Sequence, residues 1–494
     1  MTFDFTHLKY GFILVSLVFF SCTEHRVYDV VVLKGRVMDP ESGLDAVRNI
    51  GILDGKIAVV TDKNITGEDS IDATGLVVAP GFIDLHAHGQ DSISNRLQAA
   101  DGVTTALELE LGVYPLKPWL QSRAGKALIN YGASVGHLGA RIKRLTDFDA
   151  GHMPSRPPED TAYATASAIS QMTTATADEV DDIADLITAE LEEGALGIGF
   201  GIAYAPSSNR TEIFRLFQLA VEKNVPVFAH LRGADTLDRL GPFQEAIADV
   251  AASGVSLHIM HINSTAGEDA RVALEMIRGA RERGLDITTE AYPYTASSTK
   301  IESALFDDWE TYNDKRLSDF QWPITGERLT HETFRKYREQ RGWVIIHGER
   351  SEETNAWIVA QADVMVASDG IPFLYGIAHP RGAGTFSRIL GYYVREQKVL
   401  SLMDALKKMT LLPAQRLESI SPQLINKGRI RVGADADITM FDPERIIDKA
   451  NYANGGNVPS EGVVYVMVGG VLVVKDRRVL EGVFPGKAIL RRTE

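Results

Sequence analysis

The chain has 494 residues, of which 45% are hydrophobic and 24% charged; this is the composition of an ordinary globular protein and excludes wholesale disorder. The formal net charge is −15 and no basic run stands out, so nucleic acid is excluded as an expected partner. The length suits two or three domains, or one α/β barrel of roughly 250 residues with a smaller companion domain.

Residues 1–22 have the features of an export signal. The segment 11–20 (GFILVSLVFF) is apolar but too short to span a membrane, which takes about 20 residues. Cys22 follows it and is the single cysteine of the chain, so no intrachain disulfide can form. A cysteine at this place resembles the lipidation site of bacterial lipoproteins, although Phe19 and Phe20 are bulkier than usual there. We expect an exported protein that faces the periplasm or cell exterior and contacts the membrane only through a lipid on Cys22. A plain signal peptide and an uncleaved anchor are the alternatives.

Short β-type runs occur at both ends of the remaining chain. Residues 28–78 contain several, with Asp54-Gly55 as a hairpin signal between two of them. Similar runs return at 427–438, 463–474 and 488–490. We expect residues 23–79 and 426–494 to form the two halves of one small β-sandwich domain.

Residues 80–425 alternate strand-like runs with helical patterns, which indicates a parallel sheet. Eight strand-like runs can be counted: 81–90, 103–112, 128–138, 195–204, 225–232, 256–263, 286–294 and 364–370. Eight such units predict a closed (β/α)8 barrel of the TIM type. Two long inserts interrupt the alternation, at 144–176 and 297–342. Long loops in compact domains are usually functional, so we expect these inserts to shape a pocket over the barrel mouth.

The ends of these runs carry residues that bind metals. In PGFIDLHAHG at 80–89, His86 and His88 share one face because side chains alternate along a strand. Three later runs end in a further candidate ligand: His230, His261 and Asp369. Imidazole nitrogens with a carboxylate are the ligands that zinc takes in hydrolytic sites, so the pattern predicts one or two Zn²⁺ ions.

Taken together, the motifs resemble the amidohydrolase superfamily, and within it the N-acyl-D-amino-acid deacylases. The resemblance extends from about residue 30 to 491. It is carried by PGFIDLHAHG (80–89), DGVTT (101–105), EEGALGIGFGIAYAP (192–206), HLR (230–232), AYPYTASST (291–299), VASDG (366–370), HPRGAGTFSRIL (379–390) and KGRIRVGADADITMFDP (427–443). It implies a metal-dependent hydrolase of linear amide bonds that deacylates N-acyl amino acids, in this family of D configuration. Metal-bound hydroxide would attack, and Asp369 would act as the general base.

The chain departs from the family at the residue that bridges the metals. Many members use a carbamylated lysine on the fourth strand, but the run 195–204 has no lysine. D-aminoacylases use a cysteine after the second strand, where this chain has Leu111. Glu108 and Glu110 lie in the same run and share a face, and inward carboxylates in an apolar run need partners or a cation. We expect Glu110 to be the ligand, with Glu108 as the second choice; a structural ion pair, for example with Arg141, is the alternative.

The resemblance also suggests residues that bind the substrate. Tyr292, Ser298 and Arg381 are candidates for holding a carboxylate, and His379 for lining the pocket. D-aminoacylases often have a lysine where this chain has Asn263, and Lys300 is a candidate to replace that charge. Three further residues are candidates for orienting the ligands from behind: His258, Arg232 and His137.

Three functions are compatible with these features. The first is deacylation of an N-acyl amino acid. The second is a dipeptidase, or a cyclic amidase of the dihydroorotase or hydantoinase kind, although the missing lysine argues against cyclic amidases. The third is a surface lipoprotein that binds a ligand without turnover. The expected partner is a small N-acyl amino acid or dipeptide, and self-association into a homo-oligomer stays open.

Overall fold

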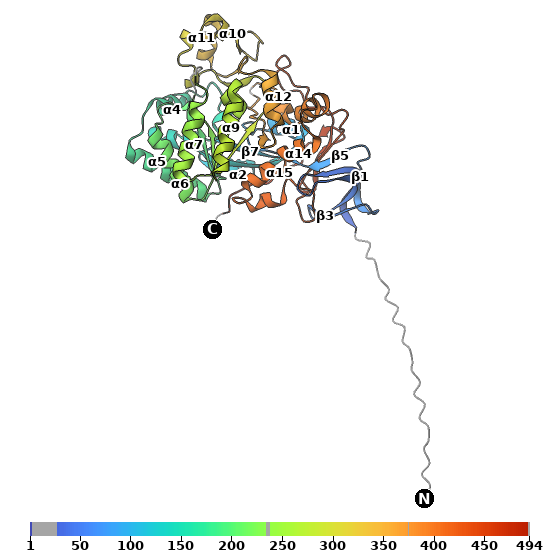
Figure 1. Ribbon diagram of the computed structural model, residues 1–494. Helices are drawn as coiled ribbons and strands as arrows, with labels where there is room; N and C mark the ends of the chain where they lie inside the picture. The colour runs from blue at the N-terminus through green and yellow to red at the C-terminus, as the bar shows by residue number, and fades with distance from the viewer. Residues whose placement is uncertain (2–26, 234–237, 374, 493–494) are drawn as a thin grey trace.

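The computed structural model describes residues 1, 27–233, 238–373 and 375–492 (Figure 1). The apolar segment 11–20 and Cys22 lie outside the described residues, so the export signal and lipid anchor stay predictions. Within those residues, every helix is too short or too polar to cross a membrane.

The centre of the molecule is a parallel sheet of eight strands in the order β16-β12-β11-β10-β9-β8-β7-β6. The strands are β6 (Phe82–Asp84), β7 (Val103–Val113), β8 (Asn130–Gly136), β9 (Ile198–Gly201), β10 (Val227–His230), β11 (Leu257–Ile259), β12 (Ile287–Ala291) and β16 (Val364–Val366). Beyond the two outer strands, Ala87 and Gly370 form a parallel bridge that brings the sheet close to closure. The predicted (β/α)8 barrel is therefore confirmed, with all eight strands inside the expected runs or within one residue of them.

Helices surround this sheet, as Figure 1 shows for α5, α6, α7 and α9. They are α1 (Ser92–Ala100), α2 (Leu116–Arg123), α3 (His137–Thr146), α5 (Ala177–Glu192), α6 (Arg210–Glu222), α7 (Gly241–Ser253), α8 (Ile262–Ala266), α9 (Ala270–Glu282), α12 (Glu352–Ala360), α13 (Arg381–Arg388), α14 (Leu402–Met409) and α15 (Leu411–Leu417). Short 3-10 helices are η2 (Ile202–Tyr204), η3 (Gly267–Asp269) and η7 (Pro422–Asn426), and η6 (Ile389–Glu396) is a π-helix that continues α13.

The sequence explains how these helices start and which face they bury. Thr176 and Glu179 form a capping box at the start of α5, which satisfies backbone N–H groups there. Ala273, Leu274 and Ile277 lie at helical spacing on α9 and are buried against the sheet. Side chains such as Leu107, Phe228 and Met260 fill the inside of the barrel, so its interior is packed and the site lies at one end.

Strands from both ends of the chain form a separate β-rich region. Nine strands make one hydrogen-bonded sheet in the order β20-β19-β18-β17-β5-β1-β2-β3, with β4 paired to β1. They are β1 (Tyr28–Asp39), β2 (Leu44–Leu53), β3 (Lys56–Thr61), β4 (Gly67–Asp72), β5 (Val77–Pro80), β17 (Ile438–Phe441), β18 (Val463–Val468), β19 (Val471–Lys475) and β20 (Arg478–Val479). The two halves join where β5 pairs antiparallel with β17.

The last residues of the chain differ from the expectation. Residues 488–490 were expected to add a strand to the β-rich region, but Ala488 bridges to Tyr131 of the barrel strand β8. Ile489 donates a hydrogen bond to the Tyr131 carbonyl at 2.7 Å and packs into the core inside the barrel. This apolar side chain closes the end of the barrel opposite the site, which no local pattern could indicate.

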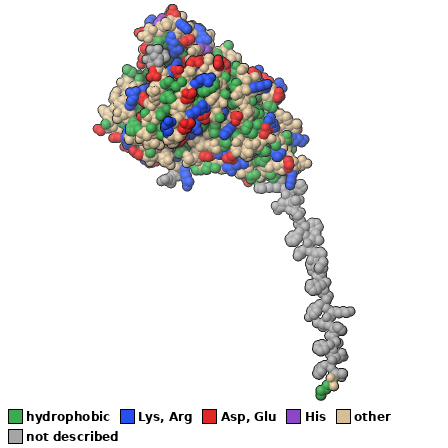
Figure 2. Space-filling model, in the orientation of Figure 1, with side chains coloured by type: hydrophobic (Ala, Val, Ile, Leu, Met, Phe, Trp, Pro, Cys, Tyr) green, Lys and Arg blue, Asp and Glu red, His purple; other side chains and the backbone are tan. Residues whose placement is uncertain are grey.

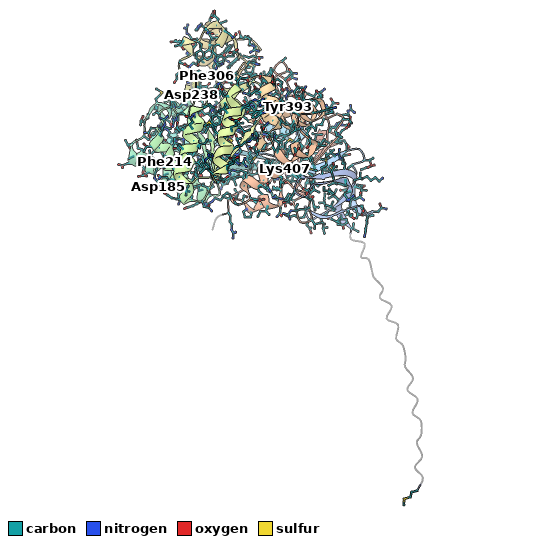
Figure 3. All side chains as sticks on the ribbon, in the orientation of Figure 1. Asp185, Phe214, Asp238, Phe306, Tyr393 and Lys407 are labelled. Atoms are coloured by element: carbon teal, nitrogen blue, oxygen red, sulfur yellow. The ribbon has the colours of Figure 1, made fainter. Side chains whose placement is uncertain are left out.

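The two inserts carry structure of their own. The first holds η1 (Met153–Ser155) and α4 (Thr161–Met172); the second holds β13 (Ser297–Lys300), η4 (Ala304–Phe306), η5 (Trp309–Thr311), α10 (Asp314–Ser318), β14 (Phe320–Gln321) and α11 (His331–Gln340), and is followed by β15 (Trp343–Ile346). The lobe with α10 and α11 stands out at the top of Figure 1 and has its own apolar core, which includes Phe306, labelled in Figure 3. Acidic, basic and apolar side chains are interspersed on the face of the molecule seen in Figure 2. Residues of both inserts line a cavity of about 880 Å³ together with the candidate ligands.

Candidate metal centre

The predicted ligands converge at one end of the barrel. Their donor atoms form three overlapping groups, each within 4.8 Å: His86, His88 and Glu110; His86, His261 and Asp369; and Glu110, His230 and His261. His261 and Asp369 follow their strands with φ of 32° and 50°. This left-handed region is rarely adopted by residues with side chains and is concentrated at functional sites.

Glu110, near the end of β7, lies between two pairs of imidazoles. Its Oε2 is 3.0 Å from His88 Nε2 and 3.3 Å from His86 Nε2. Its Oε1 is 2.8 Å from His230 Nδ1 and 2.9 Å from His261 Nε2. Because each oxygen faces a different pair of nitrogen donors, Glu110 could hold a cation together with either pair of imidazoles.

Electrostatics keep this carboxylate charged. Burial acts to raise the pKa of Glu110, but the imidazoles of His86 and His230 hold that pKa well below its ordinary value. Metal ligands must be deprotonated, so a buried carboxylate that stays ionised beside imidazole nitrogens fits a divalent cation. The donor set, with nitrogen and oxygen atoms and no sulfur, is one that zinc accepts.

Asp369 lies next to both halves of the centre. Its Oδ1 is 3.4 Å from His86 Nε2 and 3.5 Å from His88 Nε2. Its Oδ2 is 2.9 Å from Arg381 Nη1, and the other terminal nitrogen of Arg381 donates to the Ser298 carbonyl at 3.2 Å. Arg381 therefore holds this carboxylate in place and connects it to the start of the second insert.

Two further carboxylates orient the histidines from outside the centre. Glu108 Oε2 lies 2.8 Å from His88 Nδ1, and Glu290 Oε1 lies 2.9 Å from His86 Nδ1. Glu290 also accepts a hydrogen bond from the backbone N–H of His261 at 2.8 Å. Carboxylates on Nδ1 direct the opposite ring nitrogen toward a metal. Glu108 therefore lies on the outer side of His88, whereas Glu110 lies between the imidazoles, and the choice of Glu110 as ligand stays a prediction.

The environment of Glu108 includes a residue from the first insert. His152 Nε2 lies 2.9 Å from Glu108 Oε2. Burial acts to raise the pKa of Glu108, but the nearby His88 and His152 lower it to about 2. The sequence interpretation gave no role to Glu290 or His152. Glu290 could have been found by the argument used for Glu108, since it is a carboxylate in a buried strand two residues before Tyr292; His152 has no comparable local signal.

The alternative ion pair between Arg141 and a β7 glutamate is wrong. Arg141 pairs with Glu212, and the other oxygen of Glu212 lies 2.7 Å from His137 Nε2; all three side chains are buried. The expectation that His137, His258 and Arg232 orient ligands is also corrected, because their contacts are elsewhere. His258 Nδ1 lies 2.7 Å from Thr288 Oγ1, and Arg232 pairs with Glu245. Each of these residues contacts a different partner within the helix and strand packing, which sequence spacing alone does not reveal.

Comparison with known proteins now identifies the family. The model of an amidohydrolase family matches residues 161–474, more than half of the chain. The chain belongs to the amidohydrolase family.

Several relatives of this amidohydrolase are known. It is 27% identical to N-acyl-D-glutamate deacylase and 25% identical to D-aminoacylase, both from Alcaligenes xylosoxydans xylosoxydans. The first match covers 90% of this chain and 93% of the relative, and the second covers 95% and 99%. N-acyl-D-glutamate deacylase from Bordetella bronchiseptica, solved with zinc and a phosphonate mimic of the tetrahedral intermediate, has the same fold. The two structures superpose with a TM-score of 0.78 at 24% sequence identity, and the match covers 94% of this chain and 100% of the Bordetella chain. The family and these relatives confirm the predicted class, a hydrolase of carbon–nitrogen bonds other than peptide bonds.

The residues predicted to bind substrate lie at or near the cavity of the amidohydrolase. Ser298, Lys300 and Arg381 line it. Tyr292 is buried behind Arg381, whose guanidinium carbon lies 4.6 Å from the centre of the tyrosine ring. His379 is also buried, with Nε2 3.0 Å from the Ala296 carbonyl oxygen.

The two residues linked to the missing lysine have different surroundings. The Asn263 amide donates to the Tyr292 carbonyl at 2.8 Å and to Asn355 at 3.0 Å, so it supports the end of β12. The Lys300 ammonium lies 5.4 Å from the centre of the Tyr163 ring and 5.9 Å from that of Trp343, between the two inserts. Of the two residues, Lys300 lines the cavity and carries a positive charge, whereas Asn263 is buried.

Proposed function

We propose that this amidohydrolase deacylates N-acyl-D-amino acids at a zinc centre. His86, His88, Glu110, His230 and His261 would hold one or two Zn²⁺ ions, with Asp369 beside them. The observation that carries the proposal is the position of Glu110, an ionised carboxylate whose two oxygens face two separate pairs of imidazoles. A buried charge in such a place is costly unless it is paired with cations.

The chemistry divides between the cation and the side chains around it. Zinc bound to these donors supplies Lewis-acid chemistry, which polarises the amide carbonyl and makes the attacking water more acidic. Asp369 takes the proton from that water and delivers it to the leaving amine. The ion pair with Arg381 keeps the Asp369 carboxylate directed into the cavity while the proton moves. Residues of both inserts line the cavity beside these groups.

The substrate's carboxylate would bind on the side of the cavity formed by Ser298, Lys300 and Arg381. Arg381 lines the cavity and offers a guanidinium, the group best suited to bind a carboxylate. The names of the relatives, which act on N-acyl-D-glutamate and as a D-aminoacylase, support this substrate class and the D configuration.

Metal analysis combined with a substrate panel tests the proposal. The purified chain, loaded with zinc, is assayed with N-acyl-D-amino acids and N-acyl-L-amino acids that carry either a short or a long acyl chain, with dipeptides and with a dihydropyrimidine. We expect bound zinc and hydrolysis mainly of the N-acyl-D compounds. Hydrolysis of dipeptides alone would make the enzyme a dipeptidase, and hydrolysis of the dihydropyrimidine alone would make it a cyclic amidase. Zinc or ligand binding without hydrolysis of any compound would leave only a binding protein.

The export of the protein is a separate proposal that rests on residues 1–22. If Cys22 is lipidated, the full-length chain expressed in a bacterium will partition with membranes and incorporate labelled palmitate. The Cys22→Ser variant will lose the label. A label that survives this substitution contradicts the lipid assignment without bearing on the chemistry of the barrel.

A further inference from the structure

The two sides of the cavity differ in character because they follow opposite strands of the barrel. In the order of the eight strands, β12 is four places from β8, and β16 is four places from β9. Ser298 follows β12 and Arg381 follows β16, so one side carries the polar groups next to Asp369. The residues after β8 and β9 line the opposite side.

That opposite side is a continuous apolar wall, defined here as Leu111, Leu138, Ile142, Met153, Tyr163 and Tyr204. Leu138, Ile142 and Met153 are buried and belong to one apolar cluster, and the other three are partly buried and pack against it. All six line the cavity. Leu111 directly follows Glu110 in the chain, so the apolar wall begins at the metal centre.

Helix α4 extends this wall away from the metal centre. Ala164, Ser167, Ala168 and Gln171 lie at helical spacing and line the cavity. Three of these side chains are small, so they leave a channel beside the helix. Asp160, at the start of α4, is already paired, since it accepts the Tyr163 N–H at 2.9 Å and pairs with Arg156 at 2.9 Å.

The size of the cavity exceeds what a small substrate needs. Its volume is about 880 Å³, near the upper end of the roughly 300–1,000 Å³ found for pockets that bind drug-sized ligands. An N-acetyl amino acid would fill the part beside Arg381 and leave the space along α3 and α4 vacant.

We propose that the natural substrate carries a long, unbranched hydrocarbon acyl chain that lies along the apolar wall and α4. The inference rests on the proposed function. With the substrate's carboxylate at Arg381 and its scissile bond at Asp369, the acyl group points across the barrel to the side of β8 and β9. A hydrocarbon chain buries apolar surface there and needs no polar partner. The polar atoms at the wall are already paired, since Thr299 donates to the Tyr204 hydroxyl at 3.2 Å and Lys300 donates to the Met153 carbonyl at 3.4 Å.

A series of N-acyl-D-amino acids that differ only in chain length tests the inference. The zinc-loaded enzyme is assayed with acetyl, butanoyl, octanoyl and dodecanoyl derivatives of one D-amino acid. We expect kcat/KM to rise with length, mainly through a lower KM, by up to about fourfold for each fully buried methylene. A flat or falling series, with the acetyl compound hydrolysed well, overturns the inference and leaves the proposed function intact. No hydrolysis at any length refutes the proposed function itself.

Two blocking variants and one control test where the acyl chain of the substrate lies. Ala164→Phe places a ring in the channel, and we expect at least a tenfold loss of kcat/KM for the dodecanoyl compound with little change for the acetyl one. Ala162→Phe is the matched control, because Ala162 lies on the same helix but is exposed and does not line the cavity. Ser167→Phe serves as a second block if Ala164→Phe lowers the melting temperature. Equal losses for short and long chains in both blocking variants would place the acyl group elsewhere.

Discussion

At the scale of single residues, Glu110 is the carboxylate that lies between the two pairs of imidazoles. The chain has no cysteine directly after β7 and no lysine on β9. Glu110 is the residue that faces both pairs of histidines. A carboxylate can bridge two cations through separate oxygens, so the charge of the centre is kept although the residue type differs.

Removing Glu110 is therefore expected to empty the centre. Glu110→Ala should lose bound zinc, and hydrolysis with it, as measured by elemental analysis of the purified protein. Glu108→Ala removes only an orienting carboxylate and should weaken zinc affinity by roughly 10- to 100-fold. If neither variant loses metal, Glu110 is not a ligand.

Asp369 is expected to act in the reaction more than in folding. Asp369→Asn keeps the shape and the contact with Arg381 but cannot accept a proton. We expect the fold to be kept with a lowered melting temperature, because the buried Arg381 loses its charged partner, and a loss of kcat of about 10²-fold or more. Activity close to that of the natural chain would remove Asp369 from the proton transfer.

At the scale of elements, alternation along a strand explains how β7 serves the centre twice. Glu108 and Glu110 share a face because every second side chain points the same way. Glu108 lies against Nδ1 of His88. Glu110 lies against ring nitrogens of all four histidines, His86, His88, His230 and His261. Leu107 and Leu109, at the alternate positions, are buried in an apolar cluster, so a shift of one residue would put leucines in the place of both carboxylates.

A buried ion pair ties helix α3 to helix α6 behind the apolar wall. Arg141 pairs with Glu212, both fully buried, and Arg141 also donates to the Ser170 carbonyl at the end of α4. Arg141→Ala leaves the buried Glu212 carboxylate with His137 alone and should lower the free energy of unfolding by about 3–5 kcal/mol. The control is Arg36→Ala, which breaks the exposed pair with Asp45 and should cost less than about 1 kcal/mol. Denaturant titration measures both, and equal effects would contradict this account.

At the scale of the whole molecule, the metal centre connects distant parts of the chain, from β6 to the loop after β16. A cation that binds only the folded protein stabilises it by about 2.7 kcal/mol at a free concentration 100 times Kd. Removing metal with a chelator should therefore lower the melting temperature and abolish hydrolysis, and added zinc should restore both. A melting temperature that is insensitive to chelator and zinc would argue against a tight site.

Much of the fold follows from local patterns. The eight barrel strands and the hairpin at Asp54-Gly55 are indicated by alternation and turn residues close to them in the chain. The position of Ile489 against the barrel could not be predicted, because a short apolar segment near a chain end can pack against any exposed core.

The amino-acid sequence by itself determined the ring of candidate ligands, His86, His88, His230, His261 and Asp369. Each stands at the end of a recognisable strand, and parallel strands bring their ends together. Only the tertiary structure decided which glutamate faces the centre, that Arg381 pairs with Asp369, and that Arg141 binds Glu212 instead of a β7 carboxylate. These choices depend on distances between side chains far apart in the chain, which packing sets and which the local periodicity does not contain.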